Sequence, residues 1–431
     1  MRSVSFKLAI VALVAQIATS APTKNHDDHN QHPSHPDSYY VSTGPRPYYI
    51  VNNMTDSPLK TKLQSCENGP FEITGFSIGH RGGGTLQFPE ETVESTMAGA
   101  RMGAGILECD VSFTGDRGLV CRHSLCDLHT TTNILLHPDL AKKCTVPFTP
   151  ANATSPANAL CCTSDITTAE YLTLCGKQDG FNASAQNVKD YQYGTPTWRT
   201  ELYDTCGTVM TLDSYITLVE SLPGHRNFTP ELKTPPAQVP MPFKGYTQEQ
   251  YARDMLDTFI KRGISPNRVW AQSFNPPDIF QWIKEYPAFA KQAVYLDEDG
   301  DTPATLANAT ARLPSLKAKG VNIISPPFGY LLTTTPDNKT IIPSAYATTA
   351  KAAGLDIVAW TFERSGPLAN VAKNQEYYYT QIAQEISYDG QEFEVLDVLA
   401  KKVGIKAIFT DWAGTVTYYA NCMGLEYWSK S

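Results

Sequence analysis

Residues 75–84 read as an apolar strand that ends in an imidazole, a guanidinium and three glycines: Gly75-Phe76-Ser77-Ile78-Gly79-His80-Arg81-Gly82-Gly83-Gly84. At the carboxyl end of a strand, His80 and Arg81 would face the mouth of a barrel. The glycines would let the backbone approach a ligand closely. The stretch alone is equally compatible with an ordinary turn between a strand and a helix. Whether it forms part of a ligand site therefore depends on the rest of the chain.

Seven further short apolar runs follow, and helical or irregular segments separate them. This alternation predicts a parallel sheet with crossover helices. The eight expected strands are 75–80, 105–113, 229–233, 268–274, 292–296, 321–325, 356–362 and 407–411. Helical patterns lie between most of them, as at 91–102, 248–262 and 394–403. Eight strands close a (β/α)8 or TIM barrel, so we expect an α/β fold of that kind.

Two segments are too long for simple crossovers. Residues 125–228 hold six cysteines, and we expect a disulfide-rich insertion between strands two and three: Cys126, Cys144, Cys161, Cys162, Cys175 and Cys206. The barrel would then comprise 66–124 and 229–431. The second long segment, 363–390, is rich in tyrosine and is either a packed surface loop or an apolar lip for a substrate.

The pairing of the cysteines stays open. A Cys121–Cys126 bond would hold the loop that carries His123, whereas a Cys126–Cys144 bond would lie inside the insertion and leave Cys121 in the barrel or paired elsewhere. We also expect a bond between Cys66 and Cys422 that clamps the ends of the barrel. The adjacent Cys161 and Cys162 should each bond to a different cysteine and not to each other.

The chain has the marks of an exported protein. Residues 1–20 combine Arg2 and Lys7 with an apolar run and small residues, which predicts a signal peptide, and the polar, Pro-rich 21–65 predicts a disordered linker. Ten cysteines fit an oxidising compartment. We expect a secreted protein without a stable membrane anchor, glycosylated at six sequons: Asn53, Asn152, Asn182, Asn227, Asn308 and Asn338.

Composition excludes several classes of partner and fold. The chain is 42% hydrophobic and 18% charged, which suits a large packed core and excludes collagen, coiled coil and wholesale disorder. Its formal net charge of −8 provides no basic stripe for a phosphate backbone, so we expect no nucleic-acid partner. A small anionic ligand would need a local positive site.

The second strand carries two acids, Glu108 and Asp110, which stand two residues apart and therefore share one face. With Leu107, Cys109 and Val111 on the other face, both carboxylates point into the barrel. Two buried acids repel each other unless a cation lies between them, and oxygen ligands favour Mg²⁺ or Ca²⁺. The alternative is a structural pair held by salt bridges.

The third strand adds Glu231 and Lys233, again on one face, and His123 follows the second strand closely. Three carboxylates with Arg81 and Lys233 predict a metal site beside a phosphate site. Two histidines, His80 and His123, could supply the base and the acid for phosphoryl transfer near neutral pH.

In these features the sequence resembles the glycerophosphodiester phosphodiesterase family, in its secreted eukaryotic, fungal-type form. The resemblance spans strands one to eight in order and rests on His80-Arg81-Gly82, Pro89-Glu90, Glu108-x-Asp110, His123, Glu231-x-Lys233, Gln272-Ser273-Phe274, Trp360-Thr361 and Thr410-Asp411.

The resemblance implies a TIM barrel, a divalent metal and a small phosphodiester substrate. It places the metal on Glu108, Asp110 and Glu231, and catalysis on His80 and His123. Of this pair we assign His80 as the base and His123 as the acid. The substrate-binding residues would be Arg81, Glu90, Lys233 and Trp360. The reaction would release glycerol phosphate and an alcohol, through a cyclic phosphate or by direct attack of water.

The sequence departs from the family at two positions. The usual Pro-Glu-Asn-Thr reads Pro89-Glu90-Glu91-Thr92, and Ser124 follows His123 where Asp is commoner. Two alternatives remain. One is a lyase that acts on lysophospholipids and stops at a cyclic phosphate, like the more distantly similar spider-type sphingomyelinase D. The other is a non-catalytic secreted barrel that binds phosphodiesters.

Overall fold

Eight parallel strands form a closed barrel in the computed structural model, which describes residues 40–200, 206–337 and 340–425. They are β1 (Thr74–Gly79), β2 (Ala104–Phe113), β8 (Asn227–Leu232), β9 (Gln272–Ser273), β10 (Val294–Leu296), β11 (Ile323–Ser325), β14 (Asp356–Phe362) and β15 (Ala407–Thr410). β1 pairs with both β2 and β15, which closes the barrel. All eight predicted strands are present, and the predicted TIM barrel is confirmed.

Strand alternation divides the side chains of β2 between two environments. Ile106 lies in the cluster that fills the barrel, together with Ile78 and Phe409. Leu107 and Cys109 instead lie in the core between barrel and helices. Since alternate residues of a strand point to opposite faces, the even-numbered residues of β2 face inward.

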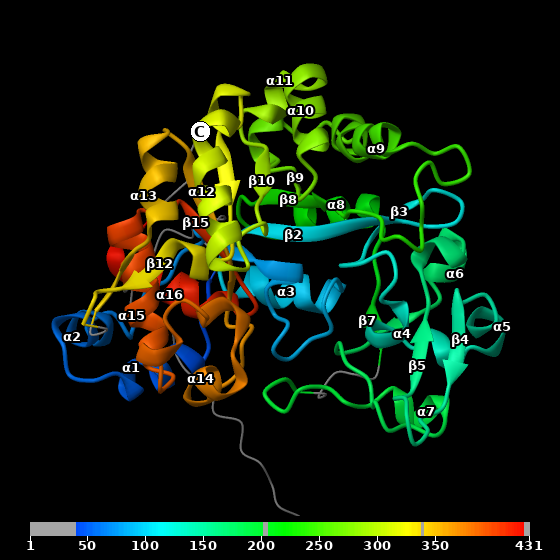
Figure 1. Cartoon of the computed structure of the whole chain (residues 1–431), viewed down its shortest axis with the longest axis horizontal. Coiled ribbons are helices and arrows are strands. Elements are labelled where there is room, and N and C mark those ends of the chain that lie inside the picture. Colours follow the sequence, from blue (N-terminus) through cyan, green and yellow to red (C-terminus); the bar gives the residue numbers. More distant parts are fainter. Residues whose placement is uncertain (1–39, 201–205, 338–339, 426–431) are drawn as a thin grey trace, which may run out of the picture. The chain divides into compact units, whose positions relative to one another are not determined.

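Helices surround the barrel (Figure 1). They are α3 (Val93–Arg101), α8 (Leu212–Ser221), α9 (Gln248–Lys261), α10 (Pro276–Glu285), α11 (Pro287–Ala290), α12 (Pro303–Ala318), α13 (Ala345–Ala352), α15 (Gln391–Asp397), which continues into η9 (Val398–Val403), and α16 (Ala413–Met423). Threonine begins several of them: the hydroxyl of Thr92 accepts a hydrogen bond from the amide of Ser95, and Thr247 serves α9 in the same way. Such caps satisfy amides that have no partner within the helix.

The segment before the first strand is helical, not disordered. It forms α1 (Arg46–Asn53) and α2 (Pro58–Gln64), whose side chains Ile50 and Leu63 are fully buried against the barrel helices. Figure 1 shows both helices in blue beside α15 and α16. The expected linker 21–65 is therefore wrong for 46–64, because apolar residues there bury enough surface to order the chain. Residues 1–39, with the expected signal peptide, lie outside the described residues.

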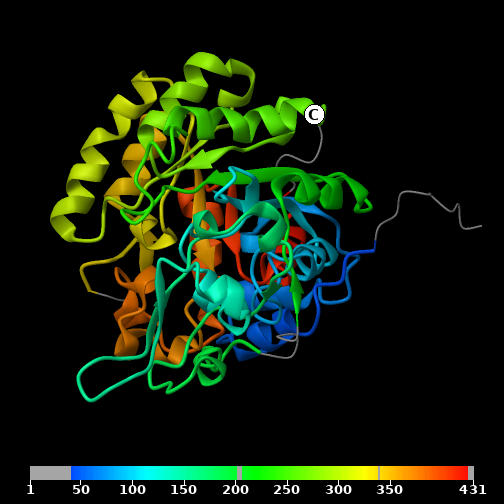
Figure 2. The same cartoon turned by 90° about the vertical axis from the view of Figure 1, so that its right-hand side faces the viewer.

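The Cys-rich insertion forms a lobe beside the barrel (Figures 1 and 2). It follows β3 (Leu119–Cys121), which pairs antiparallel with β2. Its elements are α4 (Leu128–Thr131), η2 (Ile134–Leu136), α5 (Pro138–Ala141), β4 (Val146–Thr149), β5 (Asn158–Leu160), η3 (Thr163–Asp165), α6 (Thr168–Tyr171), β6 (Cys175–Gly176), α7 (Val188–Tyr191) and β7 (Gly207–Thr208). The lobe has its own hydrophobic cluster. It ends before α8, which packs in the barrel core, so the expected boundary at 228 is too late.

Five disulfides join all ten cysteines: Cys66–Cys422, Cys109–Cys121, Cys126–Cys162, Cys144–Cys161 and Cys175–Cys206. The clamp between Cys66 and Cys422 and the separate partners of the adjacent cysteines are confirmed. The Cys121–Cys126 and Cys126–Cys144 alternatives are both wrong. β3 lies against β2 with Cys121 opposite Val111, and this pairing brings Cys121 to Cys109.

Short elements connect the main strands and helices. They are η1 (His80–Gly82), η4 (Pro266–Arg268), η5 (Phe328–Leu331), β12 (Leu332–Thr334), β13 (Ile341–Pro343), η6 (Leu368–Asn370), α14 (Val371–Asn374), η7 (Tyr377–Tyr379) and η8 (Ala383–Glu385). No helix in the described part of the chain has both the length and the apolar character needed to cross a bilayer.

Candidate active site

The turn after β1 brings His80 and Arg81 to the carboxyl end of the barrel. Arg81 has a φ of +50°, and Gly82 follows at +104°. A Cβ on Gly82 would lie 2.7 Å from the backbone nitrogen of Thr96, so only glycine lets α3 approach so closely. The backbone amide of Arg81 donates a hydrogen bond of 2.7 Å to Glu108 Oε2, which ties this turn to β2.

Three acids meet inside the barrel, as the sequence predicted. Glu108 and Asp110 come from the inner face of β2, and Glu231 on β8 lies opposite Asp110 in the parallel register. All three are buried, and an oxygen from each lies within 4.8 Å of the others. Glu108 is fixed by the Arg81 amide and by Gln272 Nε2, which donates to Oε1 at 2.7 Å.

The three buried acids repel one another when they are charged. Burial raises the pKa of Glu108, and its neighbours Asp110 and Glu231 raise it further. Burial also raises the pKa of Glu231, to about 8, although Lys233 opposes this. The pKa of Asp110 is lowered because Lys233 and Arg81 outweigh its burial. No nitrogen of the described residues lies close enough to donate a hydrogen bond to either carboxylate oxygen of Asp110, since Arg81 Nε and Lys233 Nζ are 3.6 and 3.8 Å away. Carboxylates with free lone pairs suit a hard divalent cation.

Two cations flank the acids. Arg81 Nη1 contacts both oxygens of Glu90, at 3.0 and 2.9 Å, and this pair lowers the pKa of Glu90 to about 2 despite its burial. Lys233 Nζ lies 2.5 Å from Glu231 and 3.8 Å from Asp110. Although burial disfavours its charge, these acids raise the pKa of Lys233. Both cations line the pocket, where they can attract a phosphate group.

His80 is held by a residue to which the sequence assigned no role. Its Nδ1 lies 2.5 Å from Oδ1 of Asp411, which follows β15, so Nδ1 carries the proton and donates to the carboxylate. Burial lowers the pKa of His80 to about 4, against the opposing effect of Asp411. Nε2 is then the ring nitrogen that does not contact Asp411.

His123 lines the same pocket as His80. Burial lowers its pKa well below the ordinary value, and Arg81 and Lys233 add to the effect. Carboxylate oxygens of Glu90 and Asp127 lie within 4.8 Å of a His123 ring nitrogen and of one another. An acid therefore adjoins His123 although Ser124 stands in the position where the family usually has Asp.

Aromatic side chains form one wall of the pocket, which encloses about 370 Å³ including its open mouth. Trp360 meets Phe274 edge-on with ring centroids 5.7 Å apart, and it meets Tyr378 edge-on at 5.9 Å. The indole of Trp360 is fixed because its Nε1 donates to the carbonyl of Ser325 at 2.8 Å. The predicted substrate residue Trp360 thus stands in the same pocket as His80 and Lys233.

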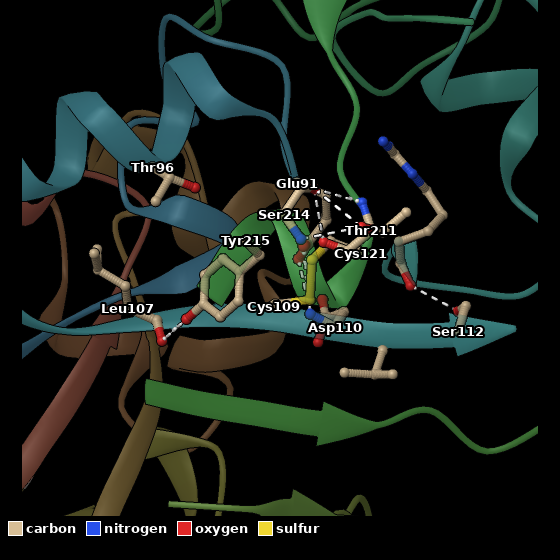
Figure 3. Close-up of a disulfide and its surroundings, with 12 residues drawn as sticks. Glu91, Thr96, Leu107, Cys109, Asp110, Ser112, Cys121, Thr211, Ser214 and Tyr215 are labelled. Carbon is tan, nitrogen blue, oxygen red and sulfur yellow. Dashed lines mark hydrogen bonds between the residues drawn. A yellow bond between two sulfur atoms is a disulfide. The ribbon is translucent and has the colours of Figure 1, made fainter. Parts of the chain in front are cut away.

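Glu91 occupies the position where the family usually has Asn, and it is fully enclosed behind β2 (Figure 3). Both of its carboxylate oxygens lie 3.3 Å from the amide of Asp110, and it adjoins the Cys109–Cys121 disulfide. Burial and the nearby Asp110 raise the pKa of Glu91 well above the usual value. It supports the strand that carries the acids.

Several polar residues of the site had no predicted role, among them Asp411, Gln272, Arg199 and Arg364. Asp411 and Gln272 lie in stretches that carry the family resemblance, and Asp411 could have been found as a polar residue at the end of a strand. Arg199 belongs to the insertion, yet its Nη2 lies 2.5 Å from Asp411 Oδ2. No pattern in the sequence connects residue 199 with the barrel mouth, because only folding brings them together.

The fold and the position of the site at the carboxyl ends of the strands define this protein as a TIM-barrel enzyme. The profile of the glycerophosphoryl diester phosphodiesterase family matches residues 80–415. The chain belongs to that family, and it is accordingly a phosphoric diester hydrolase.

The chain is also similar to individual proteins and to a solved structure. A protein of Arthroderma benhamiae named "Extracellular protein" is 45% identical over 249 residues, which is 57% of this chain and all of the relative. Glycerophosphodiester phosphodiesterase GDPD6 of Arabidopsis thaliana is 23% identical over 393 residues, 87% of this chain and 91% of that protein. A Silicibacter pomeroyi crystal structure described under the same family name shares the fold, with a TM-score of 0.51 and 18% identity over 85% of this chain and 99% of that one.

Proposed function

We propose that this protein is a secreted, metal-dependent hydrolase that converts glycerophosphodiesters into glycerol phosphate and an alcohol. The observation that carries the proposal is one pocket whose lining includes two acids, two cations and two histidines, with Asp110 close to both acids: Glu108, Glu231, Arg81, Lys233, His80 and His123. These groups meet the three needs of phosphodiester cleavage: charge neutralisation, substrate positioning and proton transfer.

The three acids would hold a single Mg²⁺ or Ca²⁺ through carboxylate oxygens. A bound divalent cation would neutralise charge on the phosphate and make phosphorus more electrophilic. Arg81 and Lys233 would bind the phosphate oxygens, and Glu90 would keep the guanidinium of Arg81 in place. Trp360 would contact the organic part of the substrate from the aromatic wall.

The histidines would move the protons. With Nδ1 bound to Asp411, His80 would accept the proton of the attacking hydroxyl at Nε2 as the new O–P bond forms. His123 would donate a proton to the alkoxide as the old P–O bond breaks. In the free protein burial and cationic neighbours keep His123 neutral, so the anionic substrate would have to raise its pKa. Attack by the glycerol 2-hydroxyl would give a cyclic phosphate that water then opens.

A second candidate is a lyase that acts on lysophospholipids and releases the cyclic phosphate. The aromatic wall favours it, because Tyr377 stacks on Trp360 with centroids 6.3 Å apart and is 42% exposed, so that the wall continues outside the pocket. An acyl chain could lie along this surface. The non-catalytic alternative is set aside, because the chain belongs to an enzyme family and every polar residue on which the resemblance rests is present.

Phosphorus NMR tests both candidates on the purified protein. Glycerophosphocholine, glycerophosphoinositol and lysophosphatidylcholine are each incubated with the protein and Mg²⁺ or Ca²⁺. Glycerol phosphate from the glycerophosphodiesters supports the hydrolase. A cyclic phosphate that persists with lysophosphatidylcholine supports the lyase, and no turnover of the first two substrates would contradict the main proposal.

Secretion and glycosylation belong to the same proposal. Asn53, Asn152 and Asn308 are exposed, and Asn182 is half-buried. Asn227 is 4% exposed within β8, so that sequon cannot carry a glycan in the folded barrel. Asn338 lies outside the described residues. Mass spectrometry of the protein from a eukaryotic culture medium, before and after glycosidase, tests the exposed sites.

A further inference from the structure

His80 depends on a carboxylate that is buried on every side. Asp411 has no exposed surface, and its Oδ1 lies 2.5 Å from His80 Nδ1. Burial alone would raise the pKa of Asp411, but Arg364, Arg199 and His80 together hold it well below the ordinary value. The orientation of the imidazole therefore depends on how firmly the other oxygen of Asp411 is held.

Two guanidinium groups hold that second oxygen. Arg199 Nη2 lies 2.5 Å from Asp411 Oδ2, and Arg364 Nη1 lies 3.0 Å from the same atom. Arg364 is shared, because its Nη2 also reaches Glu90 at 3.5 Å and its Nη1 lies 3.4 Å from Oδ1. Arg199 contacts Oδ2 alone, and its side chain is 5% exposed. It is thus the group that can fix Oδ2 without competing with His80 for Oδ1.

Arg199 belongs to the insertion, which is anchored to the loop that follows His80. The amide of Thr200 donates to the carbonyl of Leu86 at 3.0 Å, and Gln178 Nε2 donates to the carbonyl of Thr85 at 3.2 Å. The amide of Thr85 in turn donates to the carbonyl of Asp411 at 3.0 Å. The insertion therefore contacts both the loop after β1 and the residue after β15.

A packing contact of the preceding residue, Trp198, adds to the anchoring of this segment. The indole of Trp198 lies so close to Gly366 that a Cβ on that glycine would be 2.7 Å from the ring. Gly366 follows Arg364 by two residues, at a φ of +71°. The segments that deliver the two guanidinium groups to Asp411 thus pack against each other.

We propose that Arg199 is a positioning residue for His80, acting through Asp411, so that the Cys-rich insertion completes the acid–base machinery of the barrel. The proposal rests on the proposed role of His80. With Arg199 in place, Asp411 presents Oδ1 to Nδ1, which selects the tautomer with Nε2 free and keeps the ring aimed at the pocket. Without it, Arg364 alone would hold the carboxylate, and the ring would lose its fixed orientation.

Kinetics of single and double variants test the coupling. Arg199→Gln should lower kcat at least about tenfold, because a buried charge-assisted contact is lost. KM should change little, since Arg81 and Lys233 are untouched. In an Asp411→Asn background, the same substitution should change kcat by less than about twofold. If Arg199→Gln and Asp411→Asn lower kcat independently, so that their effects multiply in the double variant, the proposal is wrong.

Controls separate positioning from folding. Arg117→Gln removes an exposed arginine that donates to the carbonyl of Lys244, and it should leave kcat unchanged. Arg199→Lys should keep part of the activity, and guanidinium ions should restore part of the activity of Arg199→Ala. If Arg199→Ala is folded and active at the wild-type level, Arg199 has no positioning role. If neither the Lys variant nor guanidinium restores any activity to a folded protein, the proposal is also overturned.

Proton NMR gives a readout that needs no substrate. The Nδ1 proton of His80 should appear as a downfield imidazole resonance that His80→Ala abolishes. In Arg199→Gln this resonance should shift or broaden, while it should be unchanged in Arg117→Gln. If Arg199→Gln lowers kcat but leaves this resonance unchanged, the proposal is wrong. If the wild-type protein cleaves no glycerophosphodiester, the proposed function fails, whereas the resonance still tests the coupling of Arg199 to His80.

Discussion

Asp110 on β2 stands directly opposite Glu231 on β8, and the register of the parallel strands holds the two carboxylates together in the closed interior of the barrel. Leu107, Cys109 and Val111 on the other face of β2 are fully buried in the outer core, so the strand cannot rotate to separate the acids. The protein thus keeps like charges adjacent, an arrangement that is frequent at enzyme sites.

The acids should make stability depend on a divalent cation. Mg²⁺ or Ca²⁺ should raise the melting temperature of the wild-type protein. At a cation concentration of a hundred times Kd, the free energy of unfolding should increase by about 2.7 kcal/mol. Asp110→Asn and Glu231→Gln should fold but lose this response, and chelation should abolish wild-type activity. Asp213→Asn, an exposed acid on α8, is the control and should retain the response. Full activity in chelator would contradict the metal assignment.

The histidine pair should govern turnover. His80→Ala and His123→Ala should each lower kcat by at least about 10², the usual scale of general acid–base catalysis, with an unchanged circular dichroism spectrum. Substitution of His129, His137 or His225 should leave kcat close to wild type. A loss at any of these three comparable to that of His80→Ala would show that the pair is wrongly assigned.

The disulfide behind the acids should be important for both stability and activity. Cys109 lies between Glu108 and Asp110, and its bond to Cys121 closes a loop with a sequence separation of 12. Replacing both cysteines by alanine should lower the free energy of unfolding by about 3 kcal/mol and also lower kcat, because β2 loses its fixed position. Urea denaturation measures the first effect. Peptide mapping without reduction checks the pairing itself, and a free thiol at Cys121 would disprove it.

The N-terminal helices should contribute to stability through Arg46. This arginine pairs with Glu363, whose side chain is fully buried. Arg46→Met should lower the free energy of unfolding by about 3 kcal/mol, since it leaves a buried carboxylate without its cation. The matched control is Arg253→Met, which breaks an exposed arginine pair with Glu285 and should change the free energy of unfolding much less than Arg46→Met. If the two variants lose the same free energy of unfolding, the burial of Glu363 does not strengthen its contribution to stability.

Much of the fold could be predicted because it depends on local patterns. Alternation along 105–113 indicates which side chains share a face, and it places Glu108 and Asp110 inward without knowledge of any other strand. The repeated change from strand to helix yields eight strands and a barrel. The helices α1 and α2 were not predicted because they are short, and their few apolar residues acquire order only from burial against neighbouring helices such as α15 and α16.

The sequence by itself determined the barrel, the inward face of β2 and the residues of the resemblance, because strand periodicity and motif spacing depend on neighbours along the chain. Only the tertiary structure decided that Cys109 bonds to Cys121, that Glu91 supports Asp110 from behind, and that Arg199 reaches Asp411. Arg199 and Asp411 are 212 residues apart, and their contact exists only because the insertion folds back onto the loop after β1. Such a contact depends on the whole path of the chain, and no local pattern records it.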